Sequence, residues 1–220
     1  MNYLFQAVCG AAAGMLCKFA ADAAVAFYRK KKNLEAEESR MERGIILLLM
    51  AVFGGCFAAL FPLSAETVYY FLLMTLGMAV AITDVHHRRI PNLFLIIMLA
   101  VRICFGIPAL LGAPGFPEFP IVQSLLGLVL CFAIFFAPGF FGKSVGAGDV
   151  KLAAVMGFCL GLTNALIAIV IMGILVIVWS MVQRRMPMLE YLKSTIPMGP
   201  FLAAGMVLVP ILNQLLTLRS

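Results

Sequence analysis

The chain has 220 residues, of which 64% are hydrophobic and only 12% carry a charged side chain. Soluble domains are about half apolar and about a quarter charged, so this composition excludes an ordinary soluble domain, a disordered chain, a nucleic-acid-binding module and a secreted disulfide scaffold. The net charge of +6 indicates basic cytoplasmic loops, because Lys and Arg accumulate in the cytoplasmic loops of membrane proteins.

Long apolar runs, bounded by charged residues or by Pro and Gly, predict an all-α protein that crosses the membrane about eight times. Most runs approach the ~20 residues of a spanning helix, and none shows the ~10-residue alternation of a membrane β-barrel. The sixth and seventh runs are divided at Gly161 to Asn164, because Gly and Asn permit a turn. The predicted spans are 4–28, 44–62, 66–83, 93–112, 121–141, 149–161, 164–182 and 197–217.

The connections between these spans divide by charge into two sides. The acidic side receives Glu66 and Glu118 and, apart from Arg219 near the end of the chain, no basic residue. By the positive-inside rule the basic side faces the cytoplasm, and both termini face out. The basic connections are 29–43, 88–89, 143–151 and 184–193.

This pattern predicts a multi-pass protein of the cytoplasmic (inner) membrane with two parts. Residues 1–43 would form a first transmembrane helix and a short charged cytoplasmic loop, and residues 44–220 a membrane-embedded core. The lipid bilayer is therefore an expected partner, and nucleic acid is not.

The cysteines suggest neither a disulfide framework nor a metal site. None belongs to a CxxC or to a Cys/His pair at zinc-ligand spacing, so we expect small buried apolar residues and predict no metal or other cofactor. All six lie inside apolar runs: Cys9, Cys17, Cys56, Cys104, Cys131 and Cys159.

Three charged residues lie well inside predicted spans and away from the span ends, at depths where a charge is costly. Lys18 and Asp22 are four residues apart, a spacing that lets them neutralise each other on one helix face. Arg102 lies well inside the fourth span and requires a carboxylate partner, a carbonyl partner or a water-filled cavity. The sequence leaves these possibilities open.

Two acidic residues lie at the predicted cytoplasmic edge on different helices. Asp84 ends the third span, and Asp149 opens the sixth after Gly146 and Gly148. Two neighbouring carboxylates can hydrolyse a peptide, because one accepts a proton from water while the other donates a proton to the carbonyl. The glycines would let a substrate strand approach closely. The residues alone also fit a helix cap at Asp149 and a solvated ion pair at Asp84.

Three motifs follow one another along the chain at predicted cytoplasmic span ends. Asp84 is followed by Arg89-Ile90-Pro91-Asn92, Gly146-Ala147-Gly148-Asp149 continues as Val150-Lys151-Leu152, and Ile196-Pro197-Met198-Gly199-Pro200-Phe201 opens the last span. Over residues 44–217 the chain resembles the type IV prepilin peptidases, membrane aspartyl peptidases named for a GxGD motif.

The resemblance implies an aspartic endopeptidase that removes a short basic leader from prepilin or pseudopilin precursors at the cytoplasmic face. It places the catalytic pair on Asp84 and Asp149. The active-site loops would contain Gly146, Gly148, Lys151, Pro91 and Asn92. Structural roles are expected for Pro197, Gly199, Pro200 and Arg102.

One departure from the family concerns the first cytoplasmic loop. Many bacterial members carry a zinc-binding four-cysteine domain there, associated with methylation of the new N-terminus. Here residues 29–43 contain no Cys or His, so zinc and methyltransferase activity are not expected. The pattern is similar to the short, peptidase-only members that serve tight-adherence or archaeal-type pili.

Two other function classes remain as alternatives, a polytopic transporter and a non-catalytic membrane scaffold. A transporter places its site near the midplane, commonly at broken helices repeated in two halves, and no such repeat is visible in this sequence. A scaffold would need neither Asp84 nor Asp149.

The helix dipoles suggest an order of proton transfer. If Asp149 starts a helix, the positive end of the dipole favours its ionised form, whereas Asp84 at a helix end would favour its protonated form. This hypothesis makes Asp149 the first base and Asp84 the first acid.

Overall fold

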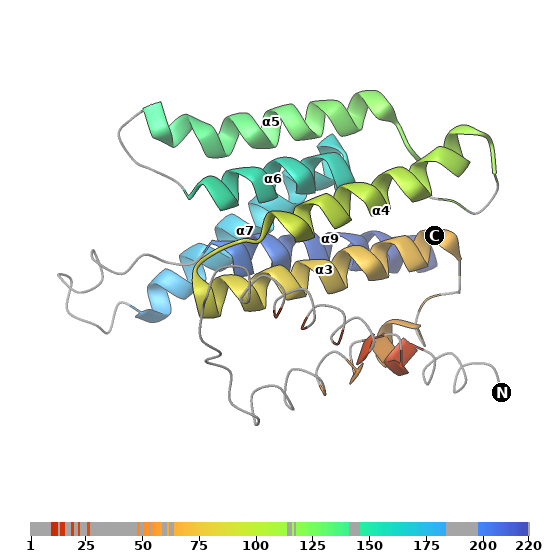
Figure 1. Cartoon of the computed structure of the whole chain (residues 1–220), viewed down its shortest axis with the longest axis horizontal. Helices are drawn as coiled ribbons and strands as arrows, with labels where there is room; N and C mark the ends of the chain where they lie inside the picture. Colours follow the sequence, from red (N-terminus) through yellow and green to blue (C-terminus); the bar gives the residue numbers. More distant parts are fainter. Residues whose placement is uncertain are drawn as a thin grey trace. The chain divides into compact units, whose positions relative to one another are not determined.

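The computed structural model describes residues 64–113, 116, 118–140, 146–183 and 198–219, together with scattered positions between 10 and 61. No strand occurs in these residues, which confirms the all-α prediction. The helices, drawn in Figure 1, are α3 (Ala65–His87), α4 (Asn92–Leu110), α5 (Ile121–Phe140), α6 (Ala147–Leu160), α7 (Leu162–Gln183) and α9 (Gly199–Arg219).

Some predicted features lie wholly or partly outside the described residues. They are the spans 4–28 and 44–62, the connections 29–43 and 184–193, the start of the connection 143–151, Lys18, Pro197, Cys9 and Cys17.

Four of the described helices are long and apolar enough to cross a membrane. They are Ala65–Val85, Asn92–Leu110, Ile121–Phe140 and Leu162–Val182, and they correspond to the predicted spans 66–83, 93–112, 121–141 and 164–182. Helix α6 has 14 residues and the apolar part of α9 is Gly199–Asn213, both shorter than the ~20 residues of a full span. The protein is therefore a multi-pass membrane protein, while the number of eight spans stays a prediction.

The chain divides into two compact units, Met1–Ala79 with Pro91–Phe119 and Val80–Ile90 with Pro120–Ser220. In the first unit, aromatic rings connect α3 to α4. The rings of Tyr69 and Phe105 lie 5.7 Å apart, and Phe105 in turn lies 6.2 Å from Phe116 in the segment after α4. That segment therefore folds back onto α4.

Arg102 is buried in this unit, with 4% of its surface exposed. Its Nη2 donates a hydrogen bond of 3.4 Å to the backbone carbonyl of Glu118. The guanidinium lies 4.6 Å from the ring centre of Phe119 and 5.4 Å from that of Tyr69, within the range of cation–π attraction. The sequence left open whether Arg102 has a carboxylate partner, a carbonyl partner or a water-filled cavity. The structure shows a carbonyl partner, together with two aromatic rings.

In the second unit, α5 packs closely along α6. A Cβ added to Gly127 would lie 3.0 Å from the carbonyl carbon of Gly157, so glycine allows the two backbones to approach. Helix α6 ends at Gly161, whose φ of +78° is in the left-handed region that glycine tolerates. Helix α7 begins at the next residue, which confirms the predicted break.

Helices α7 and α9 form the other close pair of this unit. A Cβ added to Gly205 would lie 2.6 Å from the carbonyl oxygen of Ala168. Asn213 Nδ2 donates a hydrogen bond of 3.1 Å to Asn164 Oδ1, which joins the end of α9 to the start of α7. The two helices are therefore antiparallel.

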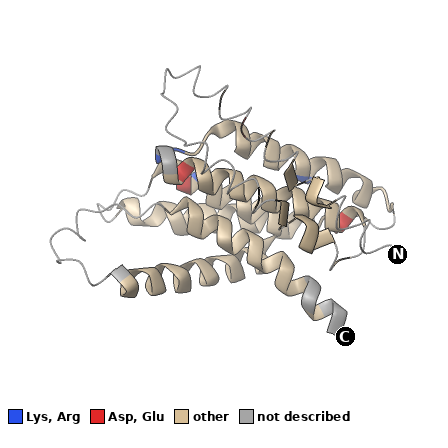
Figure 2. Cartoon of the chain, turned by 90° about the horizontal axis from the view of Figure 1, so that it is seen from below, with Lys and Arg blue, Asp and Glu red and all other residues tan. Residues whose placement is uncertain are grey.

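The outward faces of the described helices are apolar, and charged side chains are few along them (Figure 2). Cys131 and Cys159 are buried as predicted, but Cys56 and Cys104 are exposed, so for them the expectation of burial was wrong. In a membrane protein the surrounding lipid is itself apolar, so a thiol can face outward without the cost of exposure to water.

Candidate active site

Four helix ends meet at one end of the second unit (Figure 1). Asp84 near the end of α3 contacts Gly199 at the start of α9, and Ile90 after α3 contacts Gly148 at the start of α6. The end of α7 lies beside the start of α9, because the ring centre of Trp179 is 6.2 Å from that of Phe201. Residues from each of the three motif segments thus lie together at this end of the second unit.

Asp84 lies in the last turn of α3, which continues to His87, four residues beyond the predicted span 66–83. Only 6% of its surface is exposed. The backbone N–H of Gly199 donates a hydrogen bond of 3.0 Å to Asp84 Oδ2. Because a carboxylate accepts but cannot donate, this contact is suited to an ionised Asp84.

Asp149 lies in the first turn of α6, whose N-cap residue is Gly146. The Asp149 N–H donates a hydrogen bond of 2.9 Å to the Gly146 carbonyl. A Cβ added to Gly146 would lie 2.7 Å from Asp149 Oδ2, so the carboxylate folds back over the start of the helix. Glycine at 146 leaves room for that conformation.

Gly148 faces the segment that follows Asp84. A Cβ added there would lie 3.3 Å from the Ile90 Cβ, tighter than an ordinary van der Waals contact. The two glycines of the GxGD motif therefore have different local roles, Gly146 beside the carboxylate of Asp149 and Gly148 beside the main chain that carries Asp84.

The two carboxylates are close enough for their charges to interact. Burial, and after it the negative charge of Asp84, raise the pKa of the Asp149 carboxyl to about 6. Asp149 lies outside the four helices that are long enough to span the membrane, and it is half-buried. A carboxyl with this pKa can hold or release a proton near neutral pH.

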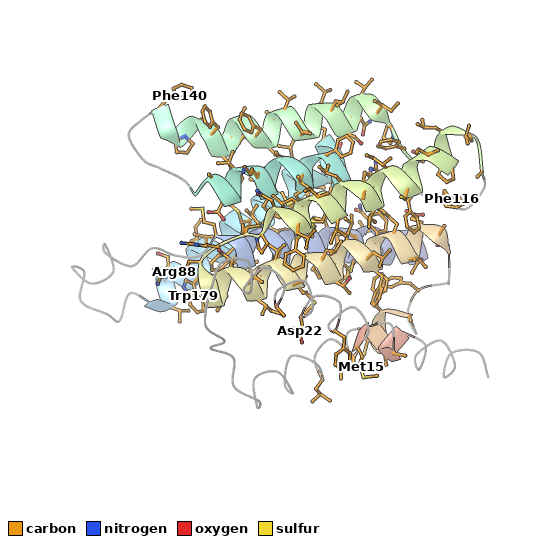
Figure 3. All side chains as sticks on the ribbon, viewed as in Figure 1. Met15, Asp22, Arg88, Phe116, Phe140 and Trp179 are labelled. Atoms are coloured by element: carbon orange, nitrogen blue, oxygen red, sulfur yellow. The ribbon has the colours of Figure 1, made fainter. Side chains whose placement is uncertain are left out.

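Arg88, labelled in Figure 3, closes the helix that carries Asp84. It has a φ of +48°, uncommon for a residue other than glycine, and its N–H donates a hydrogen bond of 2.7 Å to the Asp84 carbonyl. Its side chain is exposed, and its positive charge acts on the Asp84 carboxylate.

The other predicted site residues that the structure describes lie on α4, α6 and α9 or at their ends. Lys151 is exposed on α6, and Pro200 is half-buried next to Gly199. Pro91 is the N-cap of α4 and is buried, and Asn92 is the first residue of that helix and is exposed. Pro91, Asn92 and Arg102 belong to the first unit.

Sequence reasoning missed the roles of three residues at this end: Ile90, Trp179 and Phe201. Trp179 had a usable signal, because it is the single Trp of the chain and lies near the end of a span, where Trp is enriched at membrane–water interfaces. Nothing in the sequence indicated that Ile90 would lie against Gly148. Among the described residues, no three His, Cys, Asp or Glu side chains are placed to hold one metal ion.

A model of the type IV leader peptidase family matches residues 71–181, half of the chain, including Asp84, Asp149 and both motif glycines. The chain belongs to the type IV leader peptidase family. It is therefore a protease of the type IV leader peptidase kind. No curated protein and no solved structure matches the chain. In this peptidase, Asp84 also contacts Gly199, which lies beyond the residues that match the family.

Proposed function

We propose that Asp84 and Asp149 together activate a water molecule that hydrolyses one peptide bond of a prepilin or pseudopilin precursor at the cytoplasmic face of the inner membrane. The observation that carries the proposal is the convergence of these two acids, from α3 and α6, at one end of the second unit. Both lie within the residues that match the family, and the charge of one acts on the other.

The chemistry needs one carboxylate and one carboxylic acid. The ionised aspartate accepts a proton from water as the water oxygen bonds to the scissile carbonyl carbon, and the protonated aspartate gives its proton to the carbonyl oxygen. The resulting gem-diol then collapses: one of its hydroxyls returns a proton to the aspartate that had donated one, the C–N bond breaks, and the leaving nitrogen takes a proton from the carboxyl that had accepted one. Atoms and charges balance with water as the only co-reactant.

The contacts favour Asp84 as the first base and Asp149 as the first acid, the reverse of the order suggested by the sequence. The dipole of α6 does favour an ionised Asp149, since that residue is in the first turn. Nevertheless, burial and the charge of Asp84 raise the pKa of Asp149 to about 6, and the choice between the two acids rests on the hydrogen bond that Asp84 accepts. Asp84 meanwhile accepts the Gly199 N–H, which stabilises its charged form.

The charge distribution supports cleavage at the cytoplasmic face. Arg88, Arg89 and Lys151 are exposed near the ends of the helices that carry the two aspartates. By the positive-inside rule, basic residues next to spans mark the cytoplasmic side. The precursor would present its cleavage site where its own apolar helix meets the cytoplasm, at the depth of the two carboxylates.

The test is cleavage of a full-length prepilin precursor, with its basic leader and apolar helix, by the purified peptidase in liposomes. Asp84→Asn and Asp149→Asn should each lower kcat/KM by about a thousandfold or more, because a positioned acid or base contributes about 10²–10⁴-fold. Glu118→Gln is the matched control, since it makes the same acid-to-amide change at an exposed residue of the first unit.

Wild-type cleavage with two inactive Asn variants and an active Glu118→Gln supports the proposal. Substantial cleavage by either Asn variant contradicts the two-aspartate mechanism. Failure of the wild-type protein to cleave any of several prepilin and pseudopilin precursors contradicts the substrate class.

A further inference from the structure

The start of α9 lies against the Asp84 carboxylate. The first N–H groups of a helix have no acceptor within the helix, and at this end Pro200 has no N–H at all. Gly199, the first residue of α9, gives its N–H to Asp84 Oδ2 at 3.0 Å. An aspartate of α3 thus satisfies an N–H that α9 cannot satisfy by itself.

Position 199 has no room for a side chain. A Cβ added to Gly199 would lie 2.6 Å from Oδ2 of Asp84 and 2.8 Å from its Cβ and Cγ. Real Cβ atoms do not come this close, so any larger residue would displace the aspartate. Gly199 is itself buried, which leaves little space for the backbone to retreat.

The contact fixes one oxygen of Asp84. With Oδ2 held by the Gly199 N–H, rotation of the carboxylate about its Cβ–Cγ bond is restricted, and Oδ1 is the oxygen left to meet a reacting water. The positive end of the α9 dipole stabilises negative charge at the same place.

We propose that Gly199 is a positioning residue of the catalytic pair, which orients the Asp84 carboxylate through its backbone N–H and favours its ionised form. This inference rests on the proposed catalytic role of Asp84. It makes the start of α9 part of the catalytic apparatus, although that helix lies outside the residues that match the family.

The experiment removes the N–H without adding an atom. Cell-free translation into nanodiscs can place glycolic acid at position 199, which replaces the N–H by an ester oxygen. Cleavage of a full-length prepilin precursor is then followed as a function of pH. The same replacement at Gly205 is the matched control, because Gly205 lies on the same helix but contacts Ala168 instead of Asp84.

The ester at 199 should lower kcat by about tenfold or more with little change in KM. It should also move the acid limb of the pH–rate profile to higher pH by about one unit, because the charged form of Asp84 loses one hydrogen bond. The ester at Gly205 should lower the melting temperature and leave the pH profile in place. A merely structural role for Gly199 predicts that both esters behave like the Gly205 ester.

Gly199→Ala provides a second readout, with Gly205→Ala as its control. Because the added Cβ collides with Asp84, Gly199→Ala should lower kcat by about a hundredfold, whereas Gly205→Ala should affect stability only. An unshifted pH profile in the folded 199 variants overturns the positioning role.

Asp84→Asn is measured in parallel, so that the two proposals can fail separately. If Asp84→Asn cleaves like the wild-type protein, the two-aspartate mechanism fails. If it is inactive while the 199 variants are normal, only the positioning role of Gly199 fails.

Discussion

Gly146 and Asp149 are so close that a Cβ added to the glycine would lie 2.7 Å from Oδ2 of the aspartate. The first glycine of the GxGD motif is therefore beside the carboxylate of the residue that ends the motif. Because the colliding atom is the far end of a side chain, the aspartate can rotate away, so a substitution here would change the direction of the carboxylate before it changed the fold.

Gly146→Ala should lower kcat/KM by about ten- to a hundredfold while the protein still inserts and melts normally, because a small displacement of a catalytic group costs about this much. The measurement is precursor cleavage together with thermal melting in detergent. Gly139→Ala is the control, since a Cβ added at that helical position meets nothing within 4 Å. Equal activity of the two variants would contradict the steric role of Gly146.

Much of the site could be predicted from local sequence, because its signals are local. A charged residue at the end of an apolar run indicates the membrane edge. This signal, with the charges of the connections, predicted that Asp84 and Asp149 lie on the same side of the membrane. Gly161 between two apolar runs indicated a helix break. Helix α3 continues to His87, four residues beyond the predicted span 66–83, because the sequence shows where a helix leaves the apolar layer but not where its hydrogen bonds stop.

Contacts between distant residues could not be predicted in the same way. Gly199 and Asp84 are 115 residues apart, and their hydrogen bond depends on how α9 packs in the second unit. Likewise, the sequence required a partner for Arg102 but could not choose a carbonyl, because the choice depends on the path of the chain between α4 and α5. The proposed reversal of the acid and base roles has the same cause, because it rests on the contact between Asp84 and Gly199.

The raised pKa of Asp149 predicts an alkaline limit to activity. A general acid must be protonated, and Asp149 has a pKa of about 6, so kcat/KM should fall as pH rises through about 6, approaching a tenfold fall per pH unit above it. A carbodiimide, which reacts with protonated carboxyls, reports the same proton directly. Labelling of Asp149, read by mass spectrometry, should be half-maximal near pH 6.

Carbodiimide labelling can also test whether the negative charge of Asp84 raises the pKa of Asp149. Because the negative charge of Asp84 raises the pKa of Asp149, Asp84→Asn should move the half-labelling pH downward. Asp149→Asn, which removes the reacting carboxyl, is the control for site assignment. A wild-type midpoint near pH 4, the value of an ordinary carboxyl, would contradict the assignment of Asp149 as the acid.

Arg102→Lys should destabilise the first unit by about 1–2 kcal/mol, although the charge is kept. A guanidinium can stack flat on Phe119 and Tyr69, whereas an ammonium is more strongly hydrated and lacks the planar fork. Thermal melting in detergent is the measurement. Arg89→Lys makes the same change at an exposed position and should leave the melting temperature unchanged; equal melting of both variants would show that the aromatic contacts contribute nothing.

The hydrogen bond between Asn213 and Asn164 should couple the stabilities of α7 and α9. Asn213→Leu leaves the Asn164 amide without this donor at the helix interface and should cost about 1 kcal/mol, the typical size of such bonds between membrane helices. Adding Asn164→Leu replaces both polar groups by apolar ones and should restore part of the loss. Melting temperatures of the wild type, both single variants and the double variant give the coupling energy. Strict additivity would mean that the bond does not hold the two helices together.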